Sequence, residues 1–116
     1  MAERRRVFQV AEKIREIIAS ELMRTADPRF SMVTVTSVMA SPDMRQAKVY
    51  WIVTGGKDRI AEVTEAFTGA AGMFRRALGA GLGIRFVPQL KFFYDDTIDT
   101  SDEVARLLAK VRAQSS

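Results

Sequence analysis

The chain has 116 residues and contains neither cysteine nor histidine. Without cysteine it can form no disulfide and offers no thiolate ligand to a metal, a usage that fits the reducing cytoplasm. Without histidine it lacks the commonest general base and the commonest metal ligand. Both absences argue against most hydrolase and zinc-protein classes. We therefore expect no catalytic residues, no metal site and no cofactor.

Long apolar runs are missing as well. No run approaches the roughly 20 residues that a membrane-spanning helix needs. The N-terminus, Met1-Ala2-Glu3-Arg4-Arg5-Arg6, lacks the apolar stretch of a secretory signal. We therefore expect a cytoplasmic protein without a membrane partner. The length suits one domain, and 47% apolar residues are enough to form a core.

Acidic residues are absent from residues 66–94, although Arg75, Arg76, Arg85 and Lys91 fall in that span. A cluster of acidic residues follows directly, and the chain carries a net charge of +4. This segregation favours a basic surface that meets a polyanion such as nucleic acid. Chance segregation on a solvated surface is the alternative.

Hydrophobic periodicity predicts two long helices. Apolar residues recur every three or four positions over Val7–Leu22, and this helix should end before the proline at position 28. A second stripe covers Ile60–Leu78 and continues through Gly69 and Gly72. Asp58 is the expected N-cap of this second helix, and the three glycines after Leu78 are expected to end it.

Alternating β-branched and aromatic residues predict three strands. They cover Met32–Met39, Gln46–Thr54 and part of Ile84–Asp96. The short Ser41-Pro42-Asp43 turn favours an antiparallel pairing of the first two. A short helix is expected over Ser101–Val111. The predicted fold is α+β, with a three-stranded sheet covered on one face by helices.

We divide the chain into a basic N-terminal arm (1–6), a domain (7–96) and a C-terminal segment (97–116). The arm is either a solvated tail or an RNA contact. For Trp51, Tyr50 and Tyr94 we favour packing over base stacking. For the pair Asp95-Asp96 we favour a surface turn over a metal or acid–base site.

The glycines of the second helix allow three interpretations. A dinucleotide loop over Gly79–Gly83 is disfavoured, because such a loop follows a strand and opens a helix, whereas these glycines follow a helix. In the structural interpretation, Gly69 and Gly72 allow the helix to bend or to pack closely against another element. The third is nucleic-acid binding, since Gly69-Ala70-Ala71-Gly72 has the GxxG spacing of the loop by which KH domains clamp a nucleic-acid backbone.

Five segments in this order resemble the ribosome-binding factor A family. They are "DPR" at 27–29, "VTVTSV" at 33–38, "SPDMRQAKVY" at 41–50, "AAGMFRRALG" at 70–79 and "IRFVPQLKFFYDD" at 84–96. The resemblance implies a KH-like fold of the type II order, α-β-β-α(kink)α-β. It further implies that an Ala-x-Gly kink, here Ala70-Ala71-Gly72, replaces the usual GxxG loop.

The resemblance also implies binding of the small ribosomal subunit during late assembly, with contacts to 16S rRNA or its precursor. We expect a monomer without a small-molecule substrate that acts by stoichiometric binding rather than catalysis. A protein–protein adaptor is the alternative. Ala80 and Gly83 reduce basic character where family members often carry it, and Gln89 stands where Glu is common. The residues expected to contact RNA are Arg4, Arg5, Arg6, Ala70, Ala71, Gly72, Arg75, Arg76, Arg85 and Lys91.

Overall fold

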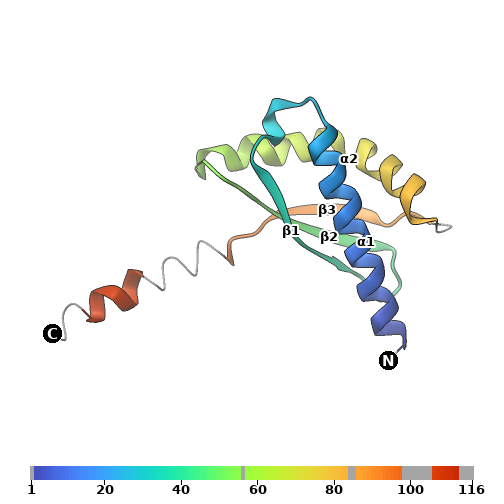
Figure 1. The fold of residues 1–116 in the computed structure, drawn as a ribbon, viewed down its shortest axis with the longest axis horizontal. Helices are drawn as coiled ribbons and strands as arrows, with labels where there is room; N and C mark the ends of the chain where they lie inside the picture. The colour runs from blue at the N-terminus through green and yellow to red at the C-terminus, as the bar shows by residue number, and fades with distance from the viewer. Residues whose placement is uncertain (1, 56, 84–85, 98–105, 113–116) are drawn as a thin grey trace.

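The computed structural model describes residues 2–55, 57–83, 86–97 and 106–112 (Figure 1). The main elements in chain order are α1 (Ala2–Arg24), β1 (Val33–Ala40), β2 (Gln46–Val53), α2 (Ile60–Leu82) and β3 (Gln89–Tyr94). Residues 106–112 are helical, in agreement with the short C-terminal helix; its expected start at Ser101 lies outside the described residues. The predicted α+β order is confirmed.

Helix α1 is longer than its apolar stripe. Ala11, Ile14 and Ile18 are buried in the core, as their spacing predicts. The helix nevertheless begins at Ala2, so that Arg4-Arg5-Arg6 form part of its first turns and are exposed to solvent. These arginines therefore do not form an arm ahead of the helix. Alanine, glutamate and arginine favour helix without any apolar periodicity, which is why the pattern missed them.

The Asp27-Pro28-Arg29 segment forms a tight turn after α1. The Asp27 carboxylate accepts the backbone N–H of Arg29 at 2.9 Å and the Arg29 guanidinium at 2.8 Å. The guanidinium hydrogen bond is the largest cause of a lowered pKa of Asp27. Arg59 donates to the carbonyls of Arg29 and Ser31 and so ties the turn to the start of α2.

The described strands form a three-stranded sheet in the order β1-β2-β3. β1 and β2 are antiparallel, and a turn joins them in which the Met44 N–H donates to the Ser41 carbonyl at 2.8 Å. A register shift between Val35 and Ser37 leaves Thr36 as a bulge. β3 pairs with β2 in parallel, which requires a crossover connection, and α2 provides it.

Both helices pack on one face of the sheet, as predicted. Trp51 of β2 is 1% exposed, and its ring centroid lies 5.4 Å from that of Phe67, which confirms its place in the core. Tyr94 also packs against Trp51, whereas Tyr50 is half-buried on the opposite face of the sheet. The core side chains include Ile14, Ile18, Val35, Val38, Ala47, Val49, Trp51, Val63, Phe67, Phe74 and Leu78.

Helix α2 continues without a break from Ile60 to Leu82. Its axis changes direction near its middle, as the green and yellow halves show in Figure 1. The Thr64 and Thr68 hydroxyls donate to carbonyls four residues earlier, at 2.7 and 3.1 Å, and such bonds bend helices. The helix thus bends without being interrupted, so the kink does not divide it into two helices.

Both predicted ends of α2 need correction. The N-cap is Arg59, without a side-chain capping bond, and Asp58 belongs to a preceding 3-10 turn. The helix also continues through Gly79 and Gly81 and ends at Gly83, whose φ of +63° is the left-handed conformation typical of a C-terminal cap.

Candidate nucleic-acid interface

The glycines of α2 serve two different purposes. At Gly81 an added Cβ would lie 2.7 Å from the Ile17 Cδ1 atom, so this glycine allows α1 to approach α2 closely. At Gly69 an added Cβ would meet nothing within 4 Å among the described residues. At Gly72 the nearest atom, Nη1 of Arg76, would be 3.6 Å away, an ordinary contact. Neither helix packing nor a positive φ therefore requires glycine at positions 69 and 72.

The segment Gly69-Ala70-Ala71-Gly72 presents a helix surface with no side chain larger than a methyl group, which we call the bare surface, although Ala70 packs partly against the core and the Arg76 guanidinium lies beside Gly72. Both glycines are exposed and both alanines are half-buried. The amides of an uninterrupted helix are already bonded to carbonyls four residues earlier, so they are not free to hold a phosphate. The small side chains instead leave the helix backbone open to close approach.

Arg75 and Arg76 follow one turn later, and both are exposed. Within the described part of the chain neither arginine forms an ion pair, whereas five other pairs do form. The remainder of α2 beyond Glu65 contains no acidic residue. Two unneutralised guanidinium groups beside a bare helix surface suit a phosphate backbone, which guanidinium binds in a bidentate manner.

Lys91 lies on the other side of the molecule. Phe92, its neighbour in β3, points towards α2, and its ring stacks on Phe67 with centroids 4.5 Å apart. Because side chains alternate along a strand, Lys91 projects from the face of the sheet that the helices leave open. The expected basic surface is therefore split: Lys91 does not join Arg75 and Arg76.

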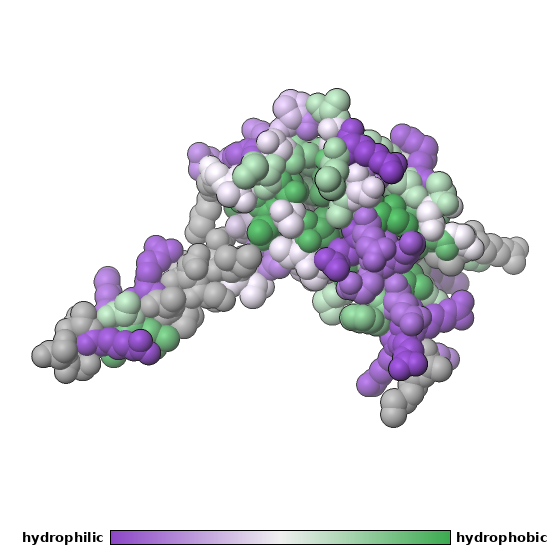
Figure 2. All heavy atoms as spheres, in the orientation of Figure 1, coloured by the Kyte–Doolittle hydropathy of each residue, from purple (hydrophilic) through white to green (hydrophobic). Residues whose placement is uncertain are grey.

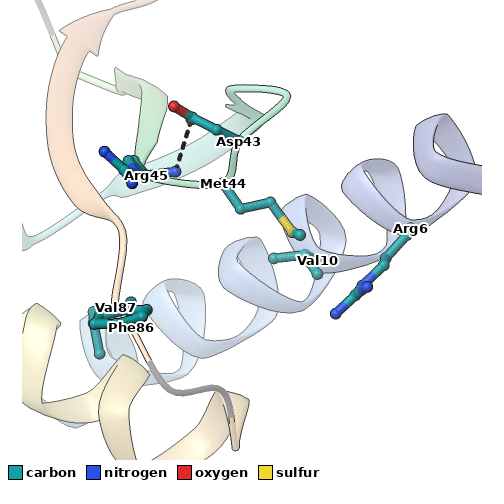
Figure 3. A pocket seen from close by; sticks show the side chains of 7 residues that line it. All are labelled: Arg6, Val10, Asp43, Met44, Arg45, Phe86 and Val87. Atoms are coloured by element: carbon teal, nitrogen blue, oxygen red, sulfur yellow. Dashed lines mark hydrogen bonds between the residues drawn. The ribbon is translucent and has the colours of Figure 1, made fainter.

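The N-terminal arginines lie on α1, whose exposed side is hydrophilic down to the N-terminus in Figure 2. Arg6 lines a hollow of about 500 Å³ together with Val10, the Asp43–Arg45 turn, Phe86 and Val87. In Figure 3 the Met44 side chain reaches towards Val10, while that of Arg45 extends away from α1. Arg85 lies outside the described residues.

The Asp43–Arg45 turn beside this hollow is held by its own hydrogen bonds. The Ser41 hydroxyl donates to the Asp43 carboxylate at 2.6 Å, and the Arg45 N–H donates to it at 3.0 Å. These bonds, the hydroxyl bond first, lower the pKa of Asp43. No sequence pattern indicated that Met44 and Phe86 line a hollow with α1, because the fold alone brings these distant parts of the chain together.

Asp95 is used structurally. Its carboxylate accepts a hydrogen bond from the Thr36 hydroxyl at 2.6 Å and another from the Thr97 N–H at 3.0 Å. The bond from Thr36 is the largest cause of a lowered pKa of Asp95. The bond from Thr36 ties the end of β3 to the bulge in β1, across β2. Among the described residues, no group of three or more carboxylates could hold a metal ion, and no helix is long and apolar enough to cross a membrane.

Comparison with known proteins gives one consistent result. The family model described as "Ribosome-binding factor A" matches residues 6–108. The ribosome-binding factor A of Thioalkalivibrio sulfidiphilus is 40% identical over 106 residues, which are 91% of this chain and 80% of that protein.

Solved structures agree in fold. The crystal structure of ribosome-binding factor A from Thermus thermophilus has a TM-score of 0.66 at 23% identity, covering 74% of this chain and 91% of that one. A Thermus thermophilus homology model fitted into a cryo-EM map of a 30S–RbfA complex has a TM-score of 0.62 at 24% identity, covering 73% and 90%. The bent α2, the mixed sheet and the match over most of the chain together show that this protein belongs to the ribosome-binding factor A family.

Proposed function

We propose that this protein binds the small ribosomal subunit through 16S rRNA or its precursor and promotes the late maturation of that subunit. Its family supports the partner, since a relative of the same fold was fitted into a map of a 30S complex. The observation that carries the proposal is the bare surface at Gly69–Gly72 beside Arg75 and Arg76. This surface combines close approach with positive charge, the two properties that a phosphate backbone needs.

The protein acts by binding and not by covalent chemistry. If it binds one conformation of an rRNA junction more tightly than another, it shifts the population towards that conformation by the difference in binding free energy. A factor of this kind is needed in amounts comparable to the subunits that are being assembled. It acts as a monomer and needs no small-molecule substrate.

A protein–protein adaptor is the competing function, and one feature favours it. A groove between the start of α1 and β1 is lined by Val7, Phe8, Ala11, Val38 and Met39, among others. Phe8 is 66% exposed and Met39 62% exposed. A partner held by this groove would bind mainly through apolar contacts, and its affinity would depend weakly on salt.

Co-sedimentation of the full chain with purified small subunits at several salt concentrations separates the two functions. RNA binding predicts a steep fall of log affinity with log salt, about 0.7 to 0.9 for each phosphate that is bound. Large subunits serve as the control for non-specific RNA binding. A salt-independent affinity that is lost in Phe8→Ala and kept in Arg75→Gln/Arg76→Gln would favour the adaptor.

Maturation needs a separate measurement. In cells depleted of the protein, we expect the fraction of small subunits that hold unprocessed rRNA ends to rise. Wild-type protein should restore processing, whereas the Arg75→Gln/Arg76→Gln variant should restore it poorly. Normal rRNA ends in depleted cells would contradict the maturation role while leaving subunit binding intact.

A further inference from the structure

The two helices cover only one face of the sheet, and no described element covers the other. Strand alternation places Lys48 and Tyr50 of β2 on this open face, together with Lys91 and Phe93 of β3. Lys48 pairs in register with Lys91, and Tyr50 pairs with Phe93. The open face thus carries a row of two lysines next to a row of two aromatic rings.

The aromatic row is accessible. The rings of Tyr50 and Phe93 have centroids 5.8 Å apart, inclined at 31°. Phe93 is 42% exposed, although its neighbour Phe92 is stacked in the core. Among the described residues the Phe93 ring contacts the Tyr50 ring, and much of its surface is left open to solvent. Exposed aromatic rings on a sheet are surfaces on which unpaired bases stack.

The lysine row has no acidic neighbour within the described sheet. On β1, Met39 pairs with Lys48 and Ser37 pairs with Tyr50. Two residues before the lysines, Gln46 pairs with Gln89. The carboxylate of Asp95, just beyond β3, is bonded to Thr36. Two like charges side by side on neighbouring strands repel each other, and a bound anion relieves that repulsion.

Spacing along the strands suits one class of ligand. Residues two apart in a strand are about 7 Å apart. A nucleotide can thus place its phosphate near the lysine row while its base reaches the aromatic row. A double helix offers no unstacked base for such rings. The charge and the rings together point to single-stranded RNA.

We propose that the open face of the sheet is a second RNA-binding surface, where a single-stranded segment stacks its bases on Tyr50 and Phe93 and pairs its phosphates with Lys48 and Lys91. The proposal rests on the small-subunit binding proposed above, which supplies such RNA. This surface lies on the face of the sheet opposite α2, which carries Arg75 and Arg76, so it is separate from the surface of the proposed function.

To test this, the full chain is titrated with an oligouridine of about eight nucleotides, and binding is monitored by NMR. We expect shifts at Lys48, Tyr50, Lys91 and Phe93. Lys48→Gln/Lys91→Gln should lower the salt slope of binding by about 0.7 for each phosphate that is no longer bound. Phe93→Ala should weaken binding about tenfold.

Two further variants control for folding and charge. Phe93→Leu keeps apolar volume but removes the ring, so it should weaken binding as Phe93→Ala does while melting like wild type. Lys13→Gln/Arg24→Gln makes the same charge change on the exposed side of α1 and should leave oligouridine affinity nearly unchanged. An equal loss of affinity in this control would show that net charge alone governs binding and would overturn the proposal.

Three other results would also overturn it: no binding at millimolar oligouridine, shifts confined to residues 69–76, or unaltered affinity in Phe93→Leu. Contacts between the Phe93 ring and residues 106–112 in RNA-free protein would show that the chain covers its own sheet, again contradicting the proposal. None of these outcomes bears on co-sedimentation with small subunits, so the two proposals fail separately.

Discussion

Replacing Gly69 or Gly72 with alanine should stabilise the fold and weaken function. Both positions lie inside α2, where glycine is about 1 kcal/mol less favourable than alanine. An added methyl group meets open space at Gly69 and an ordinary contact at Gly72. We therefore expect each substitution to raise Tm by about 4 °C. The same methyl group prevents a partner from approaching the helix backbone, so small-subunit affinity should fall.

Gly81→Ala is the matched control, because it makes the same chemical change in the same helix. There the new Cβ would lie 2.7 Å from the Ile17 Cδ1 atom and 3.2 Å from its Cγ1 atom. Ile17 must rotate or α1 must shift, and overpacking of this kind costs about 1–3 kcal/mol. The increase in Tm that alanine's higher helix propensity would give should therefore disappear or turn into a decrease. Binding by the folded protein should change little.

Thermal melts and co-sedimentation of all three variants decide the matter. The expected pattern is opposite in the two assays: Gly69→Ala and Gly72→Ala melt higher and bind worse, while Gly81→Ala melts no higher and binds normally. Higher Tm with unchanged binding would refute the idea that the bare surface receives RNA. A lower Tm for Gly69→Ala would refute the structural premise that its surroundings are open.

Three further expectations concern charge and hydrogen bonding. Arg75→Gln/Arg76→Gln should weaken small-subunit binding and flatten its salt slope by about 0.7 to 0.9 per phosphate, with unchanged melting; an unaltered slope contradicts a phosphate role. Deleting residues 1–5 should shift Tm by less than about 5 °C, because the arginines there are exposed; a larger drop would show that the first turns of α1 hold the fold. The Thr36 bond lowers the pKa of Asp95 below its usual 3.8, so its stabilisation is present above that pH and is lost as pH falls through the folded-state pKa. Thr36→Val should therefore be less stable than wild type at neutral pH and should lose less stability as the pH falls. An equal loss of stability on acidification in the variant and the wild type would contradict this.

Periodicity was sufficient to predict the elements but not their ends. Apolar spacing marks the part of α1 that faces the core, and Ile14 and Ile18 are indeed buried. It carries no information about Arg4-Arg5-Arg6, which are helical and solvated. Likewise glycine disfavours helix at positions 79 and 81, yet α2 continues through both, and α1 packs against it at Gly81. That packing joins segments far apart in sequence, so no local pattern contains it.

The separation of Lys91 from Arg75 and Arg76 could be predicted in part from the sequence. Leu90, Phe92 and Tyr94 alternate with Gln89, Lys91 and Phe93, and a strand that covers a core must turn one of these sets outwards. The more apolar set faces the helices, which sends Lys91 to the open face. What the sequence could not provide is the register that brings Lys48 beside Lys91, since it depends on parallel pairing across a crossover.

The stability that the exposed glycines cost is the physical argument for the functional role that we propose for them. A domain of this size is stable by about 5–15 kcal/mol in all. Gly69 and Gly72 together forgo about 2 kcal/mol of helix stability. Gly81 and Gly83 have structural reasons for being glycine, namely a helix contact and a positive φ. The described structure contains no such reason at positions 69 and 72. Under the proposed function, a bound partner that approaches the backbone closely would provide one, and it would lie directly beside Arg75 and Arg76.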